Sequence, residues 1–138
     1  MAATVLLGGA VAPPSTGEVS VRVSGLRSER GLVRVCLTRE RAAFPDCRKD
    51  PDARRLSVPA GDRAPIRFSA LPAGRYAVAL LHDENGNGRS DMALMMPREG
   101  FGFSRNPAAR FGPPKFAKAA FEVGDNEVIV SIRMRYLL

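Results

Sequence analysis

Hydrophobic and polar residues alternate in several short runs, and this alternation is the main indication of the fold. In residues 18–26, three valines alternate with Ser20, Arg22 and Ser24. A period of two places apolar side chains on one face of a half-buried strand. Comparable runs predict seven strands: 18–26, 31–38, 54–62, 64–71, 74–82, 118–124 and 126–137.

Turn-forming residues separate these runs, as in SERG, PAGD, LPAG and VGDN. Glycine, proline, aspartate and asparagine supply the backbone angles that tight turns need. The chain has 138 residues, the size of one domain, with 13 glycines and 11 prolines. We therefore expect one all-β domain at residues 18–138, an antiparallel β-sandwich of about seven strands.

Residues 83–117 do not fit this pattern, because they form a long connection without a clear strand. Connections of this length in compact domains are often functional. Phe101, Phe103 and Phe111 lie in this segment and, with His82, are candidate ligand-contact residues. The alternative is that these aromatic side chains cover one end of the core.

An acidic loop, HDENGNGRSD, begins this segment. Counted from Asp83, oxygen-bearing side chains fall at positions one, three, five and nine. Glycine stands at position six, and Arg89 offers its carbonyl oxygen at position seven. This spacing matches the first nine positions of the EF-hand loop, whose oxygen ligands suit Ca²⁺. The predicted metal ligands are Asp83, Asn85, Asn87, Arg89 and Asp91.

The match to the EF-hand ends at position twelve, where Leu94 replaces the bidentate glutamate. The preceding segment also reads as a strand and not as a helix. We therefore expect a calcium-type loop grafted onto β-structure, with Glu84 pointing away from the ion. The alternative is an Asx-rich turn that binds no metal.

His82 is the only histidine and immediately precedes the acidic loop. A lone histidine at a strand end is usually a packed, hydrogen-bonded residue. A hydrolase using His82 with Asp83 or Asp91 is a minor alternative, since acid–base catalysis needs a partner within hydrogen-bond reach. No nucleophile elbow or zinc-protease motif is present, and we expect no enzymatic activity.

The first 17 residues are apolar and then rich in small residues and proline. They are typical of a signal-peptide remnant, with cleavage after Ala10, or of a disordered tail. Cys36 and Cys47 are the only cysteines. In an exported protein they favour one disulfide; the alternative is two unpaired buried thiols. We expect a periplasmic or secreted protein without a transmembrane segment in the mature chain.

The net charge of +7 is scattered along the chain. Many arginines alternate with apolar residues, which is typical of the solvated faces of strands. Nucleic-acid binding would need a basic stripe or a stacking platform, and the sequence shows neither. The remaining alternative is contact with an anionic surface.

Three segments together resemble a bacterial family, domain of unknown function 2141: LPAGRYAVALLHDENGNGRSD, PREGFGFSRN and RFGPPKF. The resemblance covers about residues 18–135. It implies a small exported protein with a transthyretin-like or immunoglobulin-like sandwich, and no established activity. The chain departs from the family pattern at SDMALMMP, where Met92, Ala93 and Leu94 replace polar residues and remove further oxygen ligands.

The sequence thus predicts an exported, non-enzymatic β-sandwich in which calcium, held by the loop, has a structural role. The alternative is an extracytoplasmic module that binds an envelope or extracellular polymer through residues 83–117.

Overall fold

The computed structural model describes residues 15–86, 99–109 and 112–137. This part of the chain is mostly β-structure, with a short 3-10 helix, η1 (Arg41–Ala43), and one helical turn, α1 (Phe116–Ala119). The strands are β1 (Thr16–Ser24), β2 (Leu32–Thr38), β3 (Arg54–Pro59), β4 (Ile66–Pro72), β5 (Gly74–Asp83), β6 (Gly100–Phe103), β7 (Phe121–Val123) and β8 (Glu127–Arg133).

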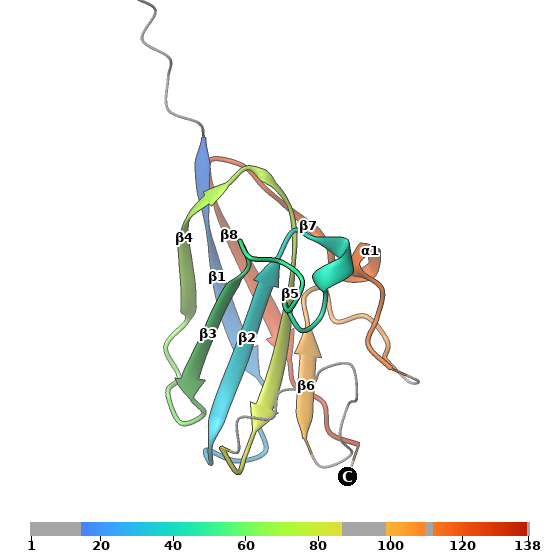
Figure 1. Ribbon diagram of the computed structural model, residues 1–138. Helices are drawn as coiled ribbons and strands as arrows, with labels where there is room; N and C mark the ends of the chain where they lie inside the picture. Colours follow the sequence, from blue (N-terminus) through green and yellow to red (C-terminus); the bar gives the residue numbers. More distant parts are fainter. Residues whose placement is uncertain (1–14, 87–98, 110–111, 138) are drawn as a thin grey trace, which may run out of the picture.

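The strands form two facing sheets, an open β-sandwich (Figure 1). Sheet A has the order β4-β1-β8, and sheet B has the order β3-β2-β5-β6. The other end of β5 pairs with β7. The expected all-β sandwich is confirmed, with one difference from an all-antiparallel arrangement. The first and last strands, β1 and β8, pair in parallel from Glu18↔Glu127 to Ser24↔Arg133.

The main core fills the space between the sheets. Sheet A contributes its valine face, and sheet B contributes alternate residues of β2 and β5. Val33, Val35 and Leu37 are buried from β2, as are Val78 and Leu80 from β5. These are the positions that the period of two assigns to the inner face.

A second apolar cluster covers the outer face of sheet B. There, Ala77, Ala79 and Leu81 of β5 lie beneath residues from η1, the following loop and α1. Phe44 makes edge-to-face contacts with Phe103 and Phe116, at centroid distances of 5.9 and 6.1 Å. Strand β5 is therefore buried on both faces.

The predicted disulfide lies in this cover. Cys36 on β2 is bonded to Cys47 in the loop after η1, with their Cα atoms 5.8 Å apart. The bond fastens the loop to the outer face of sheet B, and the alternative of two free thiols is excluded.

All seven predicted strands are present, and the structure adds β6, which the sequence analysis missed. In β6, Phe101 and Phe103 point outward while Gly100 and Gly102 face the other sheet. A β-carbon on Gly102 would lie 2.6 Å from Ile132 Cγ2, and one on Gly100 would overlap the Tyr136 ring. The glycines permit this close approach, but glycine is depleted in strands, so the four-residue segment did not read as one.

The free edge of β8 is closed by a side chain. Asn106 Oδ1 accepts a hydrogen bond from Arg133 N at 2.9 Å, and its amide nitrogen donates to Ser131 O at 3.3 Å. The amide thus occupies the groups that a further strand would need, which protects this edge from unwanted pairing.

Replacing Gly102 with alanine should destabilise the protein by about 1–3 kcal/mol, because the new methyl group overpacks against Ile132 and Met134. Gly124→Ala is the matched control, since no atom lies within 4 Å of its β-carbon position. Urea unfolding of both variants measures the difference. Equal stabilities would show that the sheets are not in close contact at Gly102.

Candidate functional site at the end of strand β5

Three consecutive polar residues end β5 and begin the acidic loop: His82, Asp83 and Glu84. Alternation places His82 and Glu84 on one side of the strand and Asp83 on the other. His82 and Asp83 are fully buried, and the Glu84 side chain is only 12% exposed. Polar side chains that are shielded from solvent need hydrogen-bond or ionic partners within the protein.

Asp83 lies on the outer side of sheet B, where it is the last residue of β5 and pairs with Leu32 of β2. Its carboxylate accepts a hydrogen bond from Arg34 Nε at 3.0 Å, which makes a buried ion pair. Its backbone carbonyl lies against Gly31, whose φ of +71° and lack of a β-carbon allow the contact. Asp83 is therefore part of the sheet as well as the first position of the loop.

Glu99 lies opposite Asp83. In the antiparallel register of β5 and β6, His82 is opposite Gly100. Continuing this register by one residue puts Asp83 and Glu99 side by side on the outer face. Burial raises the pKa of Glu99, and the charge of Asp83 raises it further, while Arg34 acts in the opposite direction. Its Oε2 atom is buried without a hydrogen-bond partner in the described part of the chain.

Glu84 belongs to a different network. Its carboxylate accepts hydrogen bonds from Arg27 Nε at 2.7 Å, Ser28 Oγ at 2.8 Å and Arg30 at 3.1 Å. Burial alone would raise the pKa of Glu84, but these bonds outweigh burial and lower it to about 2. Glu84 is on the side away from Asp83, as the alternation predicts, and it anchors residues 27–30 to the end of β5.

His82 is hydrogen-bonded through both ring nitrogens. Nδ1 lies 2.6 Å from the Tyr136 hydroxyl, and Nε2 lies 2.8 Å from the carbonyl oxygen of Arg30. A carbonyl can only accept, so Nε2 donates this bond, and in the neutral ring Nδ1 accepts from the Tyr136 hydroxyl. The same hydroxyl accepts from Arg27 N at 3.2 Å, and the Arg27 guanidinium lies 4.4 Å from the ring centroid. His82 is therefore a packed, hydrogen-bonded residue, and its ring lies on the side of β5 away from Asp83.

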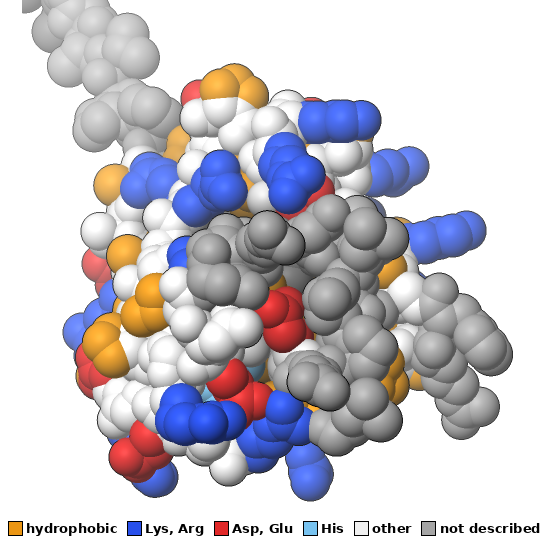
Figure 2. Space-filling view, turned by 60° about the horizontal axis from the view of Figure 1, so that its bottom comes forward, with side chains coloured by type: hydrophobic (Ala, Val, Ile, Leu, Met, Phe, Trp, Pro, Cys, Tyr) orange, Lys and Arg blue, Asp and Glu red, His pale blue; other side chains and the backbone are white. Residues whose placement is uncertain are grey.

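The acidic and basic side chains at this end of the molecule lie next to one another, as Figure 2 shows. The sequence analysis did not identify Arg34 or Tyr136 as parts of the site. Arg34 reads as an ordinary solvated strand position, and Tyr136 lies 54 residues from His82. The role of Arg34 could have been found only from the register of neighbouring strands, and no local sequence signal indicates the role of Tyr136.

The structure places part of the predicted metal loop. Asn85 is exposed in the turn after β5, where Gly86 has a φ of +61° and donates to the Asp83 carbonyl at 3.3 Å. Asn87, Arg89 and Asp91 lie outside the described residues. In the described ranges, no three His, Cys, Asp or Glu side chains are grouped as a metal site.

Phe101 and Phe103, two of the expected ligand-contact residues, lie in β6. Both side chains are only 3% exposed and pack in the outer apolar cluster of sheet B. His82, the third candidate, is also fully buried. Phe111 lies outside the described residues. The two placed aromatic residues therefore cover the core, which was the alternative interpretation.

Comparisons with known proteins found one family. The sequence model of a family described as "Uncharacterized protein conserved in bacteria (DUF2141)" matches residues 21–131. The comparison with curated proteins found no match, and the comparison with solved structures found none either. Within the described residues, no helix is long and apolar enough to cross a membrane.

The Glu84 network generates a prediction about pH. A carboxylate whose pKa is lowered on folding stabilises the folded state above its unfolded pKa of 4.5, and this contribution is lost as the pH falls towards 2. Because Arg30 is largely exposed, we expect Glu84→Gln to cost about 1–2 kcal/mol at pH 7 and almost nothing at pH 2.

Urea unfolding at the two pH values measures this effect. Glu29→Gln is the control, because the pair that Glu29 forms with Arg63 is exposed on both sides. A Glu84→Gln penalty that is the same at both pH values would refute the electrostatic explanation.

Proposed function

This chain belongs to the DUF2141 family of uncharacterised proteins conserved in bacteria, and we propose its function from its own residues. We propose that the chain is an exported β-sandwich protein whose loop at 83–91 binds calcium, and that the ion has a structural role. The proposed ligands are those expected from the loop spacing, Asp83, Asn85, Asn87, Asp91 and the Arg89 carbonyl, to which we add Glu99.

The observation that carries this proposal is the pair of carboxyl groups at the base of the loop. Like charges directly opposite on neighbouring strands destabilise a sheet. Asp83 and Glu99 occupy such positions; Asp83 is fully buried, and Glu99 is partly buried with its Oε2 atom out of reach of solvent. Arg34 lowers the pKa of Glu99, but burial and the charge of Asp83 outweigh it. A bound cation would stabilise the ionised form of both carboxyl groups.

Glu99 could also replace the carboxylate ligand that the loop motif lacks. The EF-hand closes its coordination with a glutamate at position twelve, where this chain has Leu94. Glu99, which immediately precedes the neighbouring strand β6, would supply carboxylate oxygens from outside the loop. The ion would then join the end of β5 to the start of β6 and fix both ends of the segment that connects them.

The disulfide supports export. Structural disulfides persist in oxidising compartments and are rare in the cytosol of mesophiles. The Cys36–Cys47 bond also lies in a buried part of the core cover, with both residues less than 10% exposed.

Calorimetric titration with Ca²⁺, Mg²⁺ and Zn²⁺, together with the thermal midpoint, tests the metal site. For the wild type we expect heat of binding with Ca²⁺ and about 2.7 kcal/mol of added stability at one hundred times Kd. Asp83→Asn should abolish the calcium-dependent gain, and Glu99→Gln should weaken Ca²⁺ binding at least about tenfold. Asp125→Asn, at an exposed turn, should change neither.

The calcium-dependent difference is the readout, and not absolute stability. Asp83→Asn should also destabilise the metal-free protein, because Arg34 loses its buried partner. If millimolar Ca²⁺ produces neither heat nor a midpoint shift in the wild type, the loop is an Asx-rich turn without metal.

Export predicts a processed protein outside the cytoplasm. The mature chain should begin shortly after Ala10, and cell fractionation followed by N-terminal sequencing would show this. Recovery of the unprocessed chain from the cytoplasm would contradict the proposal of export.

A further inference from the structure

The outer faces of the two sheets differ in composition. The outer face of sheet B is covered by the second apolar cluster, whereas the outward residues of sheet A are chiefly serine, arginine and glutamate. Among the described outward residues of β1, β4 and β8, Ile129 is the one large apolar side chain, and it is 53% exposed. The outer face of sheet A is therefore a polar surface open to solvent.

Three arginines cross this face in one oblique line. Arg67 of β4 is opposite Ser20 of β1, and Arg22 follows two residues further along β1. Arg22 is beside Ser131 of β8, and Arg133 follows two residues further along β8. Diagonal neighbours on one face of a sheet lie about 7–8 Å apart, so the line spans about 15 Å. It reaches across all three strands of sheet A.

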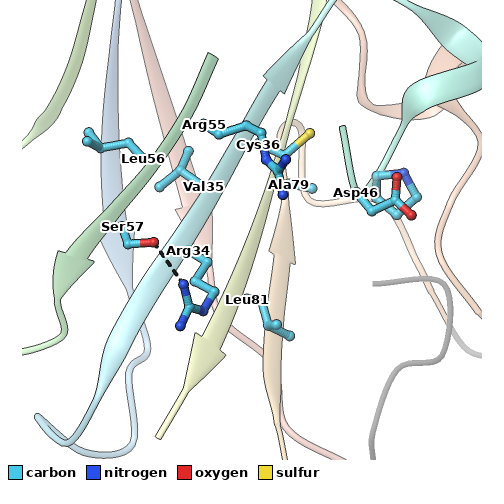
Figure 3. A pocket seen from close by; sticks show the side chains of 10 residues that line it. Arg34, Val35, Cys36, Asp46, Arg55, Leu56, Ser57, Ala79 and Leu81 are labelled. Atoms are coloured by element: carbon cyan, nitrogen blue, oxygen red, sulfur yellow. Dashed lines mark hydrogen bonds between the residues drawn. The ribbon is translucent and has the colours of Figure 1, made fainter. Parts of the chain in front are cut away.

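The guanidinium groups of these three arginines have no partner among the described residues. All three side chains are exposed, and none of them forms a hydrogen bond or an ion pair there. Arg34, on the outer face of sheet B, is different, because it bonds to Asp83 at 3.0 Å and to Ser57 Oγ at 3.1 Å (Figure 3). The arginines of sheet A can therefore offer their N–H donors to a ligand.

The acidic residues of this face are separated from the line of arginines. Glu18 and Glu127 are side by side in the parallel register, at the end where β1 and β8 begin. Glu127 accepts a hydrogen bond from Ser20 Oγ at 3.1 Å. Opposite charges on neighbouring strands stabilise a sheet, and like charges directly opposite destabilise it. Sheet stability thus does not explain this arrangement, which leaves a cationic band for an anionic ligand.

We propose that the line of arginines on sheet A binds a linear polysaccharide that carries carboxylates, such as a chain of uronic acids. Carboxylates along the chain accept hydrogen bonds from successive guanidinium forks, whose geometry suits them. Ser24 and Ser131 are exposed beside the arginines and bond to sugar hydroxyls. A single-stranded nucleic acid would favour aromatic side chains for stacking, and the described outward residues of sheet A include none.

An NMR titration of the ¹⁵N-labelled protein with polygalacturonate tests the proposal. A chelator is present, so the result does not depend on the calcium site. We expect the backbone amides of Arg22, Arg67 and Ser131 to shift, and binding to weaken as NaCl screens the charges. Fully methyl-esterified polygalacturonate has the same backbone without the charges, and monomeric galacturonate cannot span the line. Both should bind at least about tenfold more weakly.

Variants locate the site. Arg22→Gln should weaken polygalacturonate binding about two- to fivefold, because one exposed ion pair contributes little. Replacing all three arginines of the line with glutamine should weaken it at least about tenfold. The matched control replaces Arg41, Arg55 and Arg75, which are exposed on η1, β3 and β5 and lie outside sheet A. It removes the same charge and should have little effect.

Three results would overturn the proposal. The first is that the methyl-esterified polymer binds as well as polygalacturonate. The second is that the control variant weakens binding as much as the variant of sheet A. The third is that a thymidine oligonucleotide or vesicles of phosphatidylglycerol bind the line of arginines more tightly than polygalacturonate does.

Discussion

The burial of β5 on both faces is the constraint on which the rest of the structure depends. Its inner face fills the core between the sheets, and its outer face would expose Ala77, Ala79 and Leu81 if nothing covered it. The disulfide-fastened loop after η1, the aromatic residues of β6 and the turn α1 together supply that cover. Ser104, which is fully buried, joins two of these parts, because its hydroxyl accepts from Val78 N and donates to Ala119 O.

The same burial determines what happens where β5 ends. Because β5 is covered on both faces up to its end, its last polar side chains are largely shielded from solvent. Alternation then divides them: His82 and Glu84 meet Tyr136 and residues 27–30, whereas Asp83 meets Arg34. Three hydrogen bonds outweigh desolvation at Glu84, and its pKa falls. At Glu99, desolvation and the charge of Asp83 outweigh the effect of the Arg34 guanidinium, and its pKa rises.

The sequence by itself determined the seven alternating strands and the turns between them, and it favoured the pairing of the two cysteines. It could do so because period-two burial and turn chemistry are local properties of the chain. It also marked Asp83 as the start of a loop and predicted the opposite orientation of Glu84. These statements need only neighbours in the sequence.

Tertiary structure decided the rest, because the deciding contacts join distant residues. Strand β6 is short and half glycine, which disfavours a strand in the sequence, and its glycines are required by the close approach of Ile132, Met134 and Tyr136. Phe101 and Phe103 became core residues because β5 needed an outer cover. Only register brought Glu99 opposite Asp83 and aligned the three arginines of sheet A. Charge compensation depends on distance in space, which the order of residues along the chain does not contain.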